Sequence, residues 1–165
     1  FTAGARGAPR DPGLATQNLV FINGHDFPSV YTYIIRLTDE TAPAPKRVAI
    51  LGPMSTAVSF TRENELTLVI EAEDGWLRTP IDRLMRRADA RFHAGQRVSN
   101  GLFDAEIRRI SVDGRPEVVA FVFHRPLDDP SHRWVAWRDG RLEEVSPPAV
   151  GDETRLAAVH LTSLE

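Results

Sequence analysis

Residues 103–124 read FDAEIRRISVDGRPEVVAFVFH, and this stretch decides the fold class. Two apolar-rich segments flank Asp113-Gly114, a dipeptide that tolerates the backbone angles of a tight hairpin turn. The second segment is apolar at every position from Val118 to Phe123, which is typical of a strand covered on both faces. The stretch therefore predicts an antiparallel strand pair whose second strand is buried.

Six further segments carry the continuous or alternating apolar patterns of strands. They are QNLVFIN at 17–23, RVAILG at 47–52, TAVSFTR at 56–62, LTLVIEAE at 66–73, RWVAWR at 133–138 and RLEEV at 141–145. The last two flank a second Asp-Gly pair and so predict another hairpin. With the opening pair, these segments give about eight strands with mostly local connections.

Two short segments have the spacing of helices instead. After Pro28, apolar residues recur at helical intervals through Leu37. At 79–88, TPIDRLMRRA places Thr79 as an N-cap before Pro80 at the first helical position. The order of elements predicts a mainly β, α+β fold. We expect an antiparallel β-sandwich or a partly open barrel of about eight strands with two short helices.

Length and composition fit a single domain. The chain has 165 residues, and 42% of them are hydrophobic, which is enough for one core. The opening FTAGARGAPRDPG is rich in Gly, Ala and Pro. We therefore expect a linker at 1–16, the folded domain at 17–150 and a C-terminal tail at 151–165. No apolar run approaches the roughly 20 residues that a membrane-spanning helix needs.

Charge and cysteine content exclude several functional classes. The net charge is −3, from 20 basic and 23 acidic residues spread along the chain, which argues against a nucleic-acid binder. The chain has no cysteine, so disulfides, thiolate catalysis and cysteine-ligated metals are excluded. It also lacks a nucleophile elbow and the ligand pattern of a calcium loop. We expect no cofactor.

The stretch HRPLDDPSH at 124–132 is the strongest candidate for a metal or catalytic site. Side chains of the types that bind zinc and other metals fall here within nine residues, as His124, Asp128, Asp129 and His132. Two prolines bracket the loop, and an Asp before a Pro is ordinary turn chemistry. A loop joining two strands is the preferred interpretation, and a metal site is the alternative.

Other segments carry candidate ligand-binding side chains. His25 and Asp26 follow a buried strand, where α/β proteins often bind ligands, although Asp26 also suits a helix cap. Trp134 and Trp137 are candidates for a carbohydrate platform, but residues three apart on a strand point to opposite faces. The four arginines of RLMRRADAR at 83–91 favour a solvated helix face over a lipid-headgroup contact.

Three longer patterns resemble a known group of proteins. They are VSFTRENELTLVIEAEDGWL at 58–77, FHAGQRVSNGLFDAEIRRISVDGRPEVVAFVFHRPLDDPSHRWVAW at 92–137 and SPPAVG at 146–151. Over roughly 18–150 the chain resembles the C-terminal soluble region of uncharacterised bacterial multi-pass membrane proteins. The resemblance implies transmembrane segments elsewhere in a longer chain and an extracytoplasmic, periplasmic location. It implies protein partners at or in the membrane and carries over no catalytic residues.

The sequence therefore favours a non-catalytic interaction or assembly domain of a bacterial membrane protein. One alternative is a metal-dependent or hydrolytic enzyme that uses the 124–132 cluster or His25 and Asp26. Another is a carbohydrate or lipid-headgroup binding module. An interaction domain predicts an exposed apolar patch or an open sheet edge, whereas an enzyme predicts polar side chains that converge in a pocket.

Overall fold

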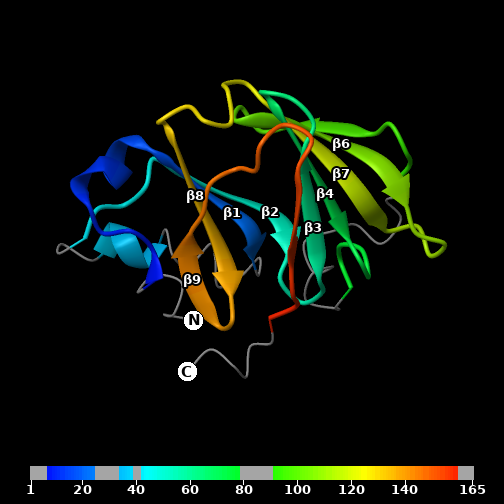
Figure 1. Cartoon of the computed structure of the whole chain (residues 1–165), viewed down its shortest axis with the longest axis horizontal. Coiled ribbons are helices and arrows are strands. Elements are labelled where there is room, and N and C mark those ends of the chain that lie inside the picture. Colours follow the sequence, from blue (N-terminus) through cyan, green and yellow to red (C-terminus); the bar gives the residue numbers. More distant parts are fainter. Residues whose placement is uncertain (1–6, 25–33, 39–41, 79–90, 160–165) are drawn as a thin grey trace.

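The structure, a computed structural model, describes residues 7–24, 34–38, 42–78 and 91–159. Within these ranges the chain forms ten strands in two sheets (Figure 1). In chain order the strands are β1 (Asn18–Gly24), β2 (Arg47–Pro53), β3 (Val58–Arg62), β4 (Thr67–Ala72), β5 (Arg97–Ser99), β6 (Phe103–Ile110), β7 (Pro116–Phe123), β8 (His132–Arg138), β9 (Arg141–Glu144) and β10 (Glu153–Leu156). The fold is a β-rich α+β sandwich, as predicted, and the described strands form no closed barrel.

The six-stranded sheet is antiparallel throughout, in the order β10-β3-β4-β7-β6-β5. It contains the predicted hairpin β6–β7, in which Gly114 takes a φ of 78°. At the predicted β8–β9 hairpin of the other sheet, both turn residues have positive φ, 47° at Asp139 and 75° at Gly140. Both Asp-Gly pairs therefore mark tight turns, as the sequence indicates.

The four-stranded sheet, in the order β2-β1-β8-β9, differs from the antiparallel arrangement expected from the sequence. Its strand β1 pairs in parallel with both β2 and β8. Parallel neighbours need a long crossover, and residues 25–46 between β1 and β2 provide it. Residues 34–38 of that crossover are helical. All seven residues of β1 are buried, as expected for a parallel strand covered on both faces.

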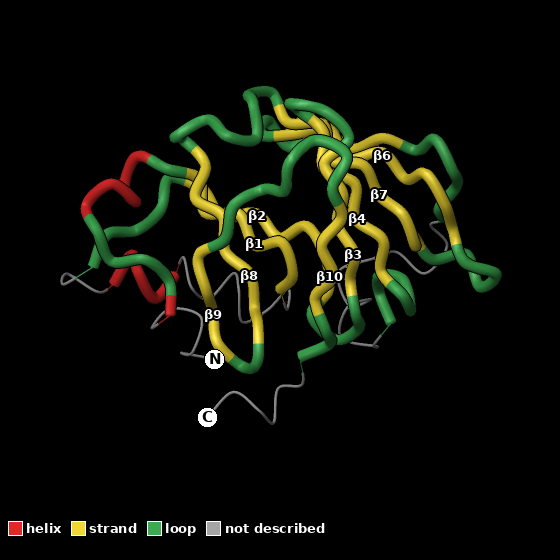
Figure 2. The backbone as a smooth tube through the Cα atoms, in the orientation of Figure 1, coloured by secondary structure: helices red, strands yellow, loops and turns green. Residues whose placement is uncertain are grey.

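Two hydrophobic cores hold the molecule together. The larger core fills the space between the sheets and contains residues such as Val20, Ile70 and Phe121. The smaller core lies on the outer face of the four-stranded sheet and includes Phe21, Val135 and Trp137. A short 3₁₀ helix, Pro12–Thr16, covers this second core, and the described helical turns lie on this side of the molecule (Figure 2).

Segments that the sequence indicated as linker and tail contribute to this packing. Leu14 is fully buried in the second core, a burial worth about 1.5–3 kcal/mol for a leucine side chain. Near the other end, β10 pairs with β3, and Val159 is buried. Leu14 and β10 lie outside the limits of 17 and 150 that composition predicts for the domain.

Some expected elements fall outside the described residues. The predicted helix at 79–88 lies wholly in this part of the chain, as does the beginning of the predicted helix after Pro28. Strands β5 and β10 were not predicted, because three or four residues rich in charge show no clear apolar alternation. None of the described helical segments is long and apolar enough to cross a bilayer.

Candidate functional site

The loop between β7 and β8 holds the metal-type side chains, and His124 stands at its start. The side chain is 45% exposed, and its Nε2 atom lies 3.5 Å from Asp104 Oδ1 on the neighbouring strand β6. A hydrogen bond from Ser99 and the nearby His124 ring lower the pKa of Asp104. His124 therefore belongs to an exposed pair on the surface of the six-stranded sheet.

Asp128 is a counterion for a buried arginine. Its Oδ2 atom accepts a hydrogen bond of 2.6 Å from Arg62 Nη2 at the end of β3. The same guanidinium donates to the carbonyl oxygens of Asn64 and Pro148, at 3.3 and 3.5 Å. Arg62 thus makes hydrogen bonds to three loops. The Asp128 carboxylate pairs with the Arg62 guanidinium, whose burial as an unpaired charge would destabilise the fold.

Asp129 builds the turn that leads into β8. Its Oδ1 atom accepts the backbone N–H of Ser131 at 2.8 Å, and its carbonyl accepts the N–H of His132 at 2.9 Å. The Arg125 guanidinium lies 3.6 Å from Asp129 Oδ2. These contacts are those of an aspartate turn before a proline, as the preferred interpretation of the loop predicts.

His132 points away from the other three, into the space between the sheets. Its ring stands edge-on to Phe123 and Trp134, with ring centroids 5.3 and 6.1 Å away. The residue is only 7% exposed, and neither ring nitrogen has a hydrogen-bond partner among the described residues. Burial lowers the pKa of His132, so the ring is neutral at pH 7.

The four side chains do not converge on one point. His124 lies beside β6, Asp128 beside Arg62, and His132 inside the core. Across the described ranges, no three His, Asp or Glu side chains are grouped so that they could hold a metal ion. The metal hypothesis therefore has no preformed ligand set in the part of the chain that the structure describes.

The second candidate region, at the end of β1, is described only in part. His25 and Asp26 lie outside the described residues, as do the arginines at 83, 86 and 87. Asn23, just before them, is fully buried. Its amide donates to the Trp137 carbonyl at 3.1 Å and accepts the Trp137 N–H at 2.8 Å. Asn23 therefore continues the β1–β8 contact with its side chain.

The tryptophans serve the cores. Trp134 and Trp137 are each 4% exposed and lie in different cores, on opposite faces of β8, as their spacing predicts. Trp134 Nε1 donates to the Leu127 carbonyl at 2.9 Å. The half-buried Trp76 donates to the Leu51 carbonyl at 3.0 Å. Because stacking on a sugar needs an exposed ring face, the pair on β8 gives no platform.

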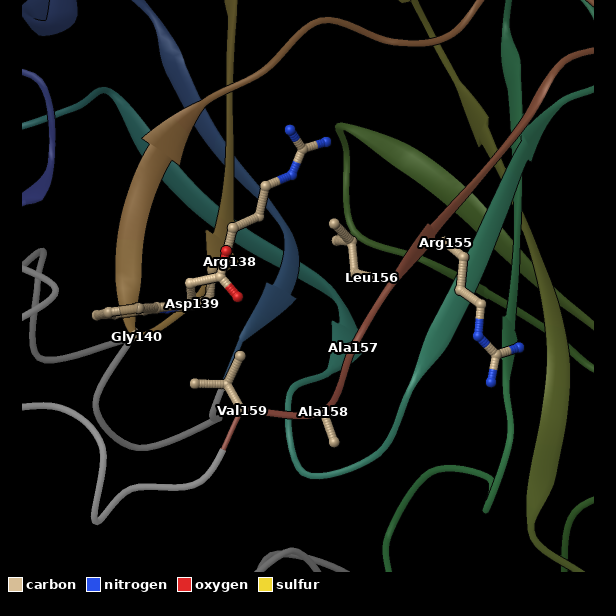
Figure 3. Close-up of a pocket in the computed structure, with 9 residues that line it drawn as sticks. Arg138, Asp139, Gly140, Arg155, Leu156, Ala157, Ala158 and Val159 are labelled. Atoms are coloured by element: carbon tan, nitrogen blue, oxygen red, sulfur yellow. The ribbon is translucent and has the colours of Figure 1, made fainter.

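The described residues form a pocket that the sequence did not indicate. Its volume is about 380 Å³, and it lies between the β8–β9 turn and the chain from β10 to Val159 (Figure 3). Arg138 and Asp139 line one side, and Leu156 lines the other. The two sides are close only because β10 returns to the six-stranded sheet, which the sequence pattern did not indicate.

Comparison of the chain with protein-family models, curated proteins and solved structures found no match. No relative therefore supplies an activity or a set of site residues. Within the described residues, three features bear on function: the free sheet edges, the buried histidine and the pocket beside Arg138.

Proposed function

We propose that this chain is a non-catalytic interaction domain of a bacterial membrane protein, and that it binds a protein partner at the free edge of β5. The supporting observation is the exposure of this edge. β5 is the outermost strand of the six-stranded sheet, and all three of its side chains are exposed. The other edge strands, β2, β9 and β10, each carry at least one partly buried side chain.

Backbone groups of β5 are available for pairing. The Ile107 N–H donates to the Gln96 carbonyl at 2.9 Å, which sets the alternation of bonded pairs between β5 and β6. By this alternation Val98 bonds inward to β6, whereas the backbone groups of Arg97 and Ser99 point away from the sheet. An extended peptide that pairs with an exposed sheet edge bonds to outward groups of this kind.

The side chains of β5 favour a particular kind of partner strand. Val98 is 60% exposed, an apolar contact at the centre of the edge. Arg97 pairs with Glu106 at 2.6 Å, so its charge is largely balanced within the sheet. A partner strand with a small apolar residue opposite Val98 fits this edge best. A short edge strand without a large apolar patch suits a regulated contact rather than a permanent one.

The proposal includes membrane attachment and a periplasmic location, because the sequence resembles the C-terminal regions of membrane proteins. On this view the domain projects from the membrane and pairs with a partner at its surface. The enzyme alternative has less support, because the His and Asp side chains of 124–132 point in different directions.

Site-specific photo-crosslinking in the full-length protein, in its native membrane, tests the proposal. A photoreactive residue at Val98 is expected to give one discrete protein adduct. The same residue at Val112, fully exposed in the β6–β7 turn, is the matched control and is expected to give none. Ser99→Pro removes an outward N–H and is expected to abolish the adduct while the domain stays folded. Equal labelling at both positions, or no adduct at Val98, contradicts the proposal.

A further inference from the structure

The pocket of Figure 3 lies where parallel strands end. Trp137, Arg138 and Asp139 stand at the carboxyl end of β8, which is parallel to β1. On the opposite wall, the Val159 N–H donates to the Met54 carbonyl at 2.8 Å, directly after β2 ends. Ligands of sheets with parallel strands bind in crevices at the carboxyl ends of those strands. A volume of about 380 Å³ falls within the roughly 300–1,000 Å³ of small-molecule sites.

Arg138 brings a positive charge to the wall of this pocket. Alternate residues of β8 before it, Trp134 and Ala136, face the space between the sheets, and Arg138 continues that row at the mouth. Its guanidinium makes no ion pair or side-chain hydrogen bond with any residue in the described ranges. By contrast, Arg133 on the other face of β8 pairs with both Asp11 and Glu144.

The second arginine of the pocket does not share this role. Arg155 pairs with Glu73 at 2.7 Å, and its side chain points away from the pocket (Figure 3). Successive residues of a strand face opposite ways, so Leu156 turns toward the interior instead. Among the described residues that line the pocket, Arg138 is therefore the arginine without an ion pair, and Leu156 and Val159 supply apolar side chains.

The charges also limit the ligand. A guanidinium forms two parallel hydrogen bonds to a carboxylate or phosphate, so Arg138 favours a planar or tetrahedral oxyanion. Asp139 lies next to it at the pocket rim and repels a ligand with several negative charges. One net negative charge and an apolar body match the lining.

We propose that this pocket binds a small organic monoanion, a carboxylate with an apolar tail. The carboxylate pairs with the Arg138 guanidinium, and the tail lies along Leu156 and Val159. This ligand comes either from solution or, as a free fatty acid, from a membrane. The proposal is independent of the partner strand at β5, which lies at the opposite edge of the six-stranded sheet from β10.

Isothermal titration calorimetry with three probes of similar tail length, seven or eight carbons, tests the head-group preference. Octanoate is expected to bind, and octyl glucoside and octylammonium are expected to bind much more weakly or not at all. Arg138→Gln is expected to weaken octanoate binding roughly 10- to 100-fold, the usual effect of losing a hydrogen-bonded charge. Arg138→Lys, which keeps the charge without the fork, is expected to fall between them.

Arg155→Gln is the matched control, since it removes a pocket arginine whose side chain points elsewhere, and its octanoate affinity is expected to match the unmodified protein. The unfolding midpoint of each variant is also measured, and it is expected to equal that of the unmodified protein. Octanoate binding together with binding to phosphatidylcholine vesicles doped with oleate assigns a membrane source, and octanoate binding alone assigns a soluble one. The proposal is overturned if octanoate does not bind, if octyl glucoside binds equally well, or if Arg138→Gln has no effect.

Discussion

At the scale of single residues, His132 has a consequence for stability. The imidazole is 7% exposed, packed edge-on to Phe123 and Trp134, without a partner for either nitrogen among the described residues. Burial lowers the pKa of His132; the charge of Asp129 and the nearby backbone of Arg125 oppose that shift, and the charge of Arg125 adds to it. Protonating this ring in the folded state would place an unpaired charge between the sheets.

Lowering the pH is therefore expected to destabilise the fold. The unfolded chain takes up a proton near the ordinary histidine pKa of about 6.5, whereas the folded chain does so only at lower pH. Between these two pKa values the unfolded state binds more protons than the folded state. The free energy of unfolding is therefore not reduced by His132 well above pH 6.5, and it falls as the pH decreases below about 6.5. The contribution of one histidine is at most about 1.4 kcal/mol per pH unit.

Urea unfolding of His132→Leu across this range measures the effect. The variant is expected to lose the His132 part of the pH dependence and to show a flatter curve than the unmodified protein. His93→Gln, at an exposed histidine, is the control and is expected to keep the original slope. An unchanged slope in His132→Leu would show that other groups cause the acid sensitivity.

At the scale of elements, the β7–β8 connection is a structural loop. Arg62 and Asp128 attach it to β3, the Asp129 turn starts β8, and His132 already belongs to the core. Each candidate ligand thus has a structural role or an orientation that separates it from the others. The residue types in a loop are visible in the sequence, but the direction of each side chain depends on the strand before or after it.

The metal hypothesis is tested by measuring thermal unfolding at increasing concentrations of zinc, manganese or calcium. A metal that binds only the folded state raises the unfolding midpoint, and 124–132 is expected to contribute no such shift. The measurement is a comparison of the unmodified protein with the double variant His124→Ala, His132→Ala. The same midpoint shift in both assigns any metal binding to other residues. A shift that the double variant loses would make this loop a metal site.

The elements also show how far sequence reasoning reached. Alternating apolar residues and Asp-Gly turns predicted β6–β7 and β8–β9 correctly, because the physical cause of each hairpin lies within a few residues. Parallel pairing of β1 with β2 and β8 was not predicted, since it depends on a crossover to β2 and on β8, which is over 100 residues away. The pocket was missed for the same reason: Arg138 and Leu156 meet only through the fold.

At the scale of the whole molecule, the N-terminal segment stabilises the sandwich because it packs into the smaller of the two cores. Leu14 and Ala8 pack on the outer face of the four-stranded sheet, which Leu19, Phe21 and Val135 form. That face would otherwise expose apolar side chains of parallel strands to water, which is unfavourable in proportion to the exposed area. The 3₁₀ helix Pro12–Thr16 therefore acts as a third layer over the sheet.

Leu14→Ala tests this third layer. Removing a fully buried leucine side chain is expected to lower the free energy of unfolding by about 2–5 kcal/mol, because the apolar contact is lost and a cavity remains. Val112→Ala, at a fully exposed valine, is the control and is expected to change stability by less than about 0.5 kcal/mol. Chemical denaturation of both variants provides the comparison. If the two variants were equally stable, the segment before β1 would contribute no packing energy, and the outer face of β1 and β8 would need another cover.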